Sequence, residues 1–145
     1  MKANIKTILL VDDSPNDVTL IKAALEDAHF GNDIIVAEDG EEALDFLYKK
    51  GKFANYAREE PVFILLDIKM PLMDGIEVLK IIRADASFND IPVIMLTSSR
   101  DIRDLQDCYD NGANSFVVKP VNMNDFMEVV KELGQYWVVI NERPV

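Results

Sequence analysis

Five polar side chains stand at the ends of short apolar runs, and their types could support cation binding and phosphoryl chemistry. They are Asp12, Asp13, Asp67, Thr97 and Lys119. Carboxylates that converge on one site repel one another, so they must either bind a proton or recruit a cation. A site of oxygen ligands with room for water suits Mg²⁺, with Mn²⁺ as the alternative ion. The residue types therefore predict a divalent-cation site built from aspartates.

The same set could also accept a phosphoryl group. Bound Mg²⁺ would neutralise the incoming group, and the Asp67 carboxylate could attack it as a nucleophile. Lys119 would pair with one phosphoryl oxygen, and Thr97 would donate a hydrogen bond to another. An acyl phosphate on Asp67 would add charge and acceptor atoms to the loops around it.

The segments that must position these residues alternate between two hydrophobic patterns. Five runs are continuously apolar, as is typical of strands covered on both faces. They are 7–11, 33–37, 62–66, 92–96 and 115–118. The intervening segments have helical periodicity, and in the first of them Leu20, Ala24 and Ala28 share one face. The other periodic segments are 43–47, 78–82, 105–109 and 126–133.

Strand–helix alternation repeated five times predicts a parallel sheet with helices on both faces and right-handed crossovers. Helix N-caps are expected at Ser14, Asp39 and Asn122, and C-caps at Gly31 and Gly112. Ligands of such sheets bind beyond the carboxyl ends of the strands. Because the polar set falls at those ends, we expect its members to converge on one pocket.

Composition limits the classes of protein that fit. The 145 residues suit one domain, and the net charge of −11 argues against binding to the nucleic-acid backbone. Cys108 is the only cysteine, which excludes an intrachain disulfide and favours a reducing cytoplasm. No apolar run approaches the roughly 20 residues of a membrane span, and the N-terminus does not read as a secretory signal.

Four stretches, ILLVDDSPND, LLDIKMPLMDG, PVIMLTSS and SFVVKP, resemble the receiver domain of two-component response regulators. The resemblance covers residues 5–133. It implies a flavodoxin-like, doubly wound α/β fold with five parallel strands in the order 2-1-3-4-5 and five helices. Residues 1–145 would be a single receiver domain, with 134–145 extending the last helix.

The resemblance also implies roles for the site residues. Asp67 would be the phosphoacceptor, and Asp12 and Asp13 would be acids of the Mg²⁺ site. The backbone carbonyl of Lys69 would be a further ligand of the ion. The protein would catalyse its own phosphorylation and slow dephosphorylation without being a turnover enzyme.

A conformational switch is the next implication of the resemblance. Thr97 and Phe116 would form the switch pair, and the Lys119–Pro120 peptide would be cis. Phosphorylation in this family draws the threonine inward, and the aromatic ring follows. That movement repacks the face made by the fourth helix, the fifth strand and the fifth helix.

The partners implied are a sensor histidine kinase and a phosphotransfer protein or downstream protein target. The enlarged segment before the third strand and the LGQYW stretch resemble stand-alone regulators that serve phytochrome-type kinases. The apolar tail and the aromatic residues of 49–61 suggest a homodimer. No feature of the sequence predicts a nucleic-acid or membrane partner.

Three other interpretations fit the sequence less well. A phosphatase of the haloacid dehalogenase type needs a second acid two residues after its nucleophile, where this chain has Lys69. A flavodoxin-like cofactor binder needs a phosphate loop after the first strand, but the loop here is Asp-Asp-Ser-Pro. A receiver that acts only by docking would not need all five polar residues.

Overall fold

The computed structural model describes residues 7–27, 33–55, 60–98, 102–119, 124 and 128. Five strands form one sheet in the order β2-β1-β3-β4-β5, and all four pairings are parallel. The strands are β1 (Thr7–Val11), β2 (Asp33–Ala37), β3 (Phe63–Asp67), β4 (Val93–Thr97) and β5 (Ser115–Val118). The predicted strand number, direction and order are therefore confirmed.

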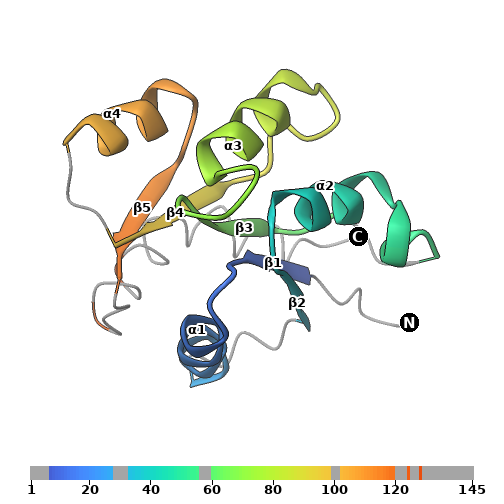
Figure 1. Ribbon diagram of the computed structural model, residues 1–145, viewed down its shortest axis with the longest axis horizontal. Helices are drawn as coiled ribbons and strands as arrows, with labels where there is room; N and C mark the ends of the chain where they lie inside the picture. The colour runs from blue at the N-terminus through green and yellow to red at the C-terminus, as the bar shows by residue number, and fades with distance from the viewer. Residues whose placement is uncertain are drawn as a thin grey trace, which may run out of the picture.

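Helices cover both faces of this sheet (Figure 1). They are α1 (Pro15–Asp27), α2 (Gly40–Tyr48), the short 3₁₀ helix η1 (Gly51–Phe53), α3 (Gly75–Ala84) and α4 (Ile102–Asp110). In Figure 1, α1 lies on one side of the sheet, and α2, α3 and α4 lie on the other. The predicted fifth helix and its 134–145 extension lie outside the described residues, apart from the helical Asn124 and Glu128.

The core has two layers because successive residues of a strand point to opposite faces. In β1, Leu9 and Val11 belong to the cluster packed against α2 and α3, and Ile8 and Leu10 belong to the cluster packed against α1. Every residue of β1, β3 and β4 is buried. This two-sided burial explains why these strands are continuously apolar rather than alternating.

The three predicted helix ends that fall on described residues are confirmed. Ser14 Oγ accepts the backbone N–H of Asp17 at 3.3 Å, and Asp39 Oδ1 accepts that of Glu42 at 2.8 Å. Gly112 follows α4 with a φ of 96°, which favours glycine. At the end of α2, Lys49 takes the left-handed conformation with a φ of 56°. The caps predicted at Gly31 and Asn122 lie outside the described residues.

The structure corrects two details of the prediction. β3 and β4 begin and end one residue later than predicted, so Asp67 and Thr97 are the last residues of their strands. Leu20 was placed on the buried face of its helix, but it is 56% exposed. The buried stripe of α1 is formed by Ile21, Ala24 and Leu25. Leu20 precedes Ile21 by one residue, so its side chain points away from the stripe toward solvent.

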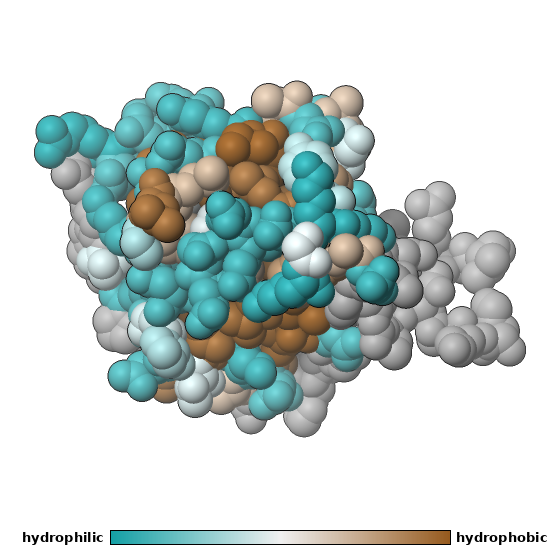
Figure 2. Space-filling view, turned by 45° about the vertical axis from the view of Figure 1, so that its right-hand side comes forward, coloured by the Kyte–Doolittle hydropathy of each residue, from teal (hydrophilic) through white to brown (hydrophobic). Residues whose placement is uncertain are grey.

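The surface is mainly polar. The face shown in Figure 2 is largely hydrophilic, with hydrophobic atoms in separate patches. The large apolar residues exposed in the described part of the chain are Leu20, Tyr48, Leu72, Ile81 and Tyr109. No helix among the described residues has the length and apolarity needed to cross a membrane.

Candidate functional site

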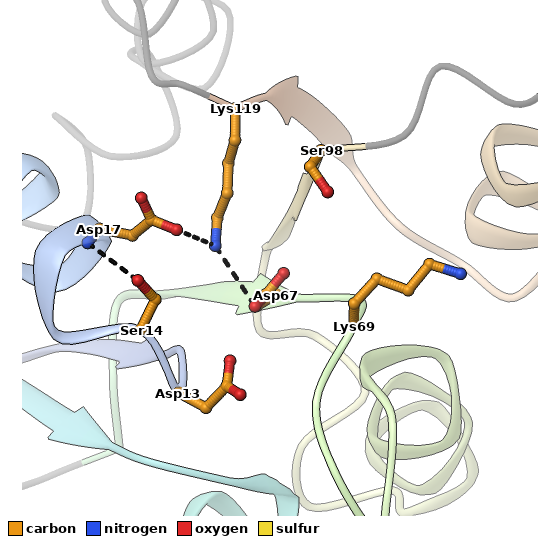
Figure 3. A pocket seen from close by; sticks show the side chains of 7 residues that line it. All are labelled: Asp13, Ser14, Asp17, Asp67, Lys69, Ser98 and Lys119. Carbon is orange, nitrogen blue, oxygen red and sulfur yellow. Dashed lines mark hydrogen bonds and ion pairs between the residues drawn. The ribbon is translucent and has the colours of Figure 1, made fainter.

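The predicted polar residues meet at the carboxyl ends of the strands. Asp12 follows β1, Asp67 ends β3, Thr97 ends β4 and Lys119 follows β5. A pocket of about 400 Å³ opens at this edge of the sheet. Figure 3 shows the residues that line it, which are Asp13, Ser14, Asp17, Asp67, Lys69, Ser98 and Lys119.

Three aspartates form the acidic part of the site. Asp12, Asp13 and Asp67 each offer a carboxylate oxygen, and these atoms lie within 4.8 Å of one another. Asp12 and Asp67 are only 1% and 4% exposed, whereas Asp13 is exposed. Crowded carboxylates that supply only oxygen ligands, at a pocket open to water, fit a hard divalent cation.

Lys119 supplies the positive charge that faces these acids. Its Nζ lies 2.7 Å from Asp12 Oδ2, 2.8 Å from Asp17 Oδ2 and 3.3 Å from Asp67 Oδ2. The Lys119 side chain is only 9% exposed, so water screens these contacts weakly. The ammonium group therefore neutralises part of the acidic cluster and lies within reach of any group attached to Asp67.

The surroundings of Asp67 and Lys119 change their affinities for protons. Burial raises the pKa of Asp67 to about 6; the Lys119 ammonium opposes this shift, and the Asp12 carboxylate adds to it. Burial alone would lower the pKa of Lys119, but its bonds to Asp12 and Asp17 and the charge of Asp67 raise it. Lys119 is therefore cationic at neutral pH, and Asp67 is ionised there at a cost in free energy.

Local backbone contacts fix the two buried acids. Asp12 Oδ1 accepts the backbone N–H of Ser14 at 3.0 Å, which holds that carboxylate against the start of α1. Gly75, the first residue of α3, donates its N–H to Ile68 O at 2.8 Å. A Cβ at position 75 would lie 2.1 Å from the carbonyl oxygen of Asp67, so a residue without a side chain is required there.

Lys69 lies at the rim of the pocket, and its side chain points away from Asp67 (Figure 3). Its Nζ is 3.8 Å from Asp104 Oδ2 on α4. The Lys69 side chain is 64% exposed, so this ion pair contributes little to stability. The ion pair between Lys69 and Asp104 nevertheless joins the loop after β3 to α4.

The two residues predicted as a switch pair do not line the pocket. Thr97 is 3% exposed at the end of β4, and its neighbour Ser98 lines the pocket instead. Phe116 on β5 is partly buried, and its ring meets Tyr109 of α4 edge-on, with centroids 5.9 Å apart. The predicted cis peptide involves Pro120, which lies outside the described residues.

Sequence reasoning missed three residues of the pocket, Ser14, Asp17 and Ser98, of which Ser14 was predicted only as a helix N-cap. Asp17 was not predicted as a site residue, yet its carboxylate contacts Lys119, which is 102 residues away in the chain. Ser98 gave no sequence signal of a site residue, because a serine after a strand is common in turns. The signal for Asp17 was its place in the first turn of the helix that follows β1, since this turn lies beside the strand ends.

Comparisons with known proteins agree with this geometry. The family model "Response regulator receiver domain" matches residues 8–131. The probable methanogenesis regulatory protein FilR2 of Methanothrix harundinacea (strain 6Ac) is 37% identical over 139 residues, which are 94% of this chain and 86% of FilR2. The response regulator Rcp1 of Synechocystis sp. (strain ATCC 27184 / PCC 6803 / Kazusa) is 34% identical over 133 residues, which are 92% of this chain and 89% of Rcp1.

Solved structures show the same likeness. The bacteriophytochrome response regulator AtBRR superposes with a TM-score of 0.82 at 44% identity, covering 90% of this chain and 94% of AtBRR. The Mn²⁺-bound form of Rcp1 superposes with a TM-score of 0.77 at 32% identity, covering 97% of each chain. The similar structures thus include a phytochrome response regulator and one with a bound divalent cation.

Proposed function

Because the chain belongs to the response regulator receiver domain family, we propose that it accepts a phosphoryl group on Asp67 from a sensor histidine kinase, in a Mg²⁺-dependent reaction. It is a signalling protein rather than a turnover enzyme. The observation that carries the proposal is the position of Asp67: it is buried at a strand end, clustered with Asp12 and Asp13, and 3.3 Å from Lys119.

Each residue has a role in this proposal. One carboxylate oxygen of Asp67 forms the bond to phosphorus as the bond from phosphorus to the donor's imidazole nitrogen breaks, and the electron pair of that bond stays on the imidazole. Lys119 binds a phosphoryl oxygen as charge develops. The backbone carbonyl of Lys69, together with Asp12, Asp13 and Asp67, would hold the ion. When bound, Mg²⁺ or Mn²⁺ would supply further positive charge at the phosphoryl oxygens.

The output would come from the surface around α4 and β5. We propose that Thr97 donates a hydrogen bond to the phosphoryl group and that Phe116 follows by moving further into the core. The support is that Thr97 is buried directly beside the pocket-lining Ser98. The Phe116 ring is only partly buried and contacts the exposed Tyr109, so its movement would change the surface of α4. A cis peptide bond between Lys119 and Pro120 belongs to the same proposal.

The proposed partner is a phytochrome-type histidine kinase in the cytoplasm. The support is the 44% identity to a bacteriophytochrome response regulator over 90% of this chain. We further propose that residues 1–145 act as one receiver domain, with 134–145 extending the last helix. A phosphotransfer protein or another downstream protein would receive the signal, and a homodimer is the proposed assembly.

The mass of the intact protein after incubation with acetyl phosphate tests the central proposal. Wild type should gain one phosphoryl group in the presence of Mg²⁺, and hydroxylamine should remove it because an acyl phosphate is labile to that nucleophile. Asp67→Asn should gain nothing. The control Glu41→Gln, which removes an exposed acid from α2, should behave as wild type. Equal labelling of Asp67→Asn, or no labelling of wild type in Mg²⁺, would contradict the proposal.

A further inference from the structure

Asp17 is a fourth carboxylate at the site, and it comes from α1 rather than from a strand end. Its Oδ2 accepts a hydrogen bond from Lys119 Nζ at 2.8 Å, which is shorter than the 3.3 Å between Lys119 and Asp67 (Figure 3). Its side chain is 30% exposed at the wall of the pocket. Lys119 is thus held more closely by Asp17 than by the proposed phosphoacceptor.

Helix capping does not explain the position of this carboxylate. In α3 of the same chain, Glu77 occupies the corresponding third helical position, and its Oε1 accepts the N–H of the N-cap Asp74 at 3.1 Å. In α1, the N–H of the N-cap Ser14 is bonded to Asp12 Oδ1 instead. The Asp17 carboxylate is therefore not used in a reciprocal cap and is directed to Lys119.

The ammonium group of Lys119 has three N–H donors, and three carboxylates already surround it. A phosphoryl oxygen on Asp67 can take over the N–H that now faces Asp67 Oδ2 at 3.3 Å, and it draws Lys119 closer when one of the other two carboxylates gives way. Asp12 is 1% exposed and tied to Ser14, so on release from Lys119 its charge would lose its counter-ion with little access to water. Asp17 is partly exposed, so water can take over its solvation.

We infer that Asp17 is a positioning residue that holds Lys119 in the unphosphorylated protein and releases it when a phosphoryl group arrives. This inference rests on the proposed function. Asp17 adds negative charge to the pocket, so it strengthens cation binding and weakens binding of a phosphoryl group. Its release also breaks a direct link between the first turn of α1 and the end of β5.

The test compares two affinities in wild type and Asp17→Asn, measured by calorimetric titration. One is the Kd for Mg²⁺ alone, and the other is the Kd for trifluoroberyllate, a phosphoryl stand-in, at saturating Mg²⁺. Asp17→Asn should weaken Mg²⁺ binding about threefold and tighten trifluoroberyllate binding about threefold, which is the size expected for a partly exposed ion pair. Changes of opposite sign distinguish this role from a structural one, which would weaken both.

Two further variants serve as controls. Asp17→Glu keeps the charge and should stay closer to wild type than Asp17→Asn in both affinities. Glu26→Gln removes an exposed acid from the far end of the same helix and should change neither affinity by more than about twofold. If Asp17→Asn weakens both affinities, or changes them no more than Glu26→Gln does, the inference is wrong while the proposed function stands. If wild type binds no trifluoroberyllate, the proposed function itself fails, and this inference fails with it.

Discussion

At the scale of single residues, Asp67 is a carboxyl group whose surroundings act on its charge in opposite directions. Burial and the nearby Asp12 disfavour the ionised form, and Lys119 favours it. Burial has the largest effect, so the pKa of Asp67 rises to about 6. The metal-free protein therefore holds its proposed nucleophile in a state that is costly at neutral pH, and a bound cation would reduce that cost.

The pH dependence of stability follows from this shift. Between about pH 4 and pH 6 the folded protein binds more protons at Asp67 than the unfolded chain does, so this group lowers stability as pH rises through that window. Asp67→Asn removes the cost. We expect the variant to be more stable than wild type by roughly 1–3 kcal/mol above pH 7, with the difference shrinking toward pH 4.

Urea unfolding at a series of pH values, with a chelator present, measures this difference. Asp107→Asn, which changes an exposed acid on α4, should show no comparable trend with pH. A difference between Asp67→Asn and wild type that is constant with pH, or of the opposite sign, would show that burial does not control the charge of Asp67.

At the scale of elements, the close approach of α3 to β3 is what fixes the backbone of Asp67. Gly75 starts α3, and a Cβ there would lie 2.1 Å from Asp67 O, a backbone atom that cannot move without shifting the strand end. Gly40 starts α2 in a similar way, but a Cβ there would meet side-chain atoms, the nearest being Val78 Cγ2 at 2.8 Å. Alanine variants at positions 75 and 40 can therefore be compared directly, because the added Cβ meets backbone in one and side chains in the other.

Gly75→Ala should destabilise the protein by about 3 kcal/mol, and Gly40→Ala by about 1 kcal/mol, because a side chain relaxes more easily than a strand end. Gly75→Ala should also slow phosphorylation by acetyl phosphate in the fraction that stays folded, since it displaces Asp67. Thermal unfolding and the rate of mass gain measure the two effects. Equal losses of stability in both variants would contradict the argument.

A second set of contacts ties the elements together at the opposite end of the sheet. Arg83 of α3 donates hydrogen bonds to Ile91 O and Gly112 O at 2.9 Å each, and to Asn114 Oδ1 at 2.9 Å. These bonds join the end of α3 to the loops before β4 and β5. These bonds stabilise the end of the sheet opposite the pocket, where the buried Asp67 is costly to ionise.

Much of this architecture could be predicted because it depends on local patterns. Runs such as 8–11 are apolar at every position because both faces of the sheet are covered, and the sequence shows this pattern before the fold is known. Asp12, Asp67 and Lys119 could be placed together because each lies at the end of such a run. The likeness to receiver domains supplied the strand order.

The remaining details depend on contacts between distant parts of the chain. The bond between Asp17 and Lys119 joins residues 102 positions apart, and nothing in either local sequence requires it. Leu20 has the spacing of a buried residue, but the side of α1 that packs on the sheet carries Ile21, Ala24 and Leu25 instead. The exposure of such residues is set by how a helix is rotated on the sheet, which local periodicity defines only to within about one position.

At the scale of the whole molecule, the net charge of −11 destabilises the compact state by self-repulsion, and part of that repulsion is concentrated in one pocket. Any cation should reduce the repulsion among charges spread over the surface by screening. A cation bound at Asp12, Asp13 and Asp67 should also reduce the repulsion among the carboxylates of the pocket. Mg²⁺ and NaCl should therefore differ in their effects on stability at equal ionic strength.

We expect Mg²⁺ at about ten times its Kd to stabilise wild type by about 1.4 kcal/mol more than NaCl of equal ionic strength, because a ligand that binds only the folded state adds its binding free energy to folding. Asp13→Asn should lose most of this specific increment and keep the response to NaCl, since Asp13 is the exposed member of the cluster and its replacement leaves the buried pairs intact. Mn²⁺ should act like Mg²⁺ because it prefers the same oxygen ligands. Thermal unfolding in matched buffers measures the increment. If Asp13→Asn responds to Mg²⁺ as fully as wild type, the ion stabilises the molecule through its overall charge and the aspartate cluster does not bind it.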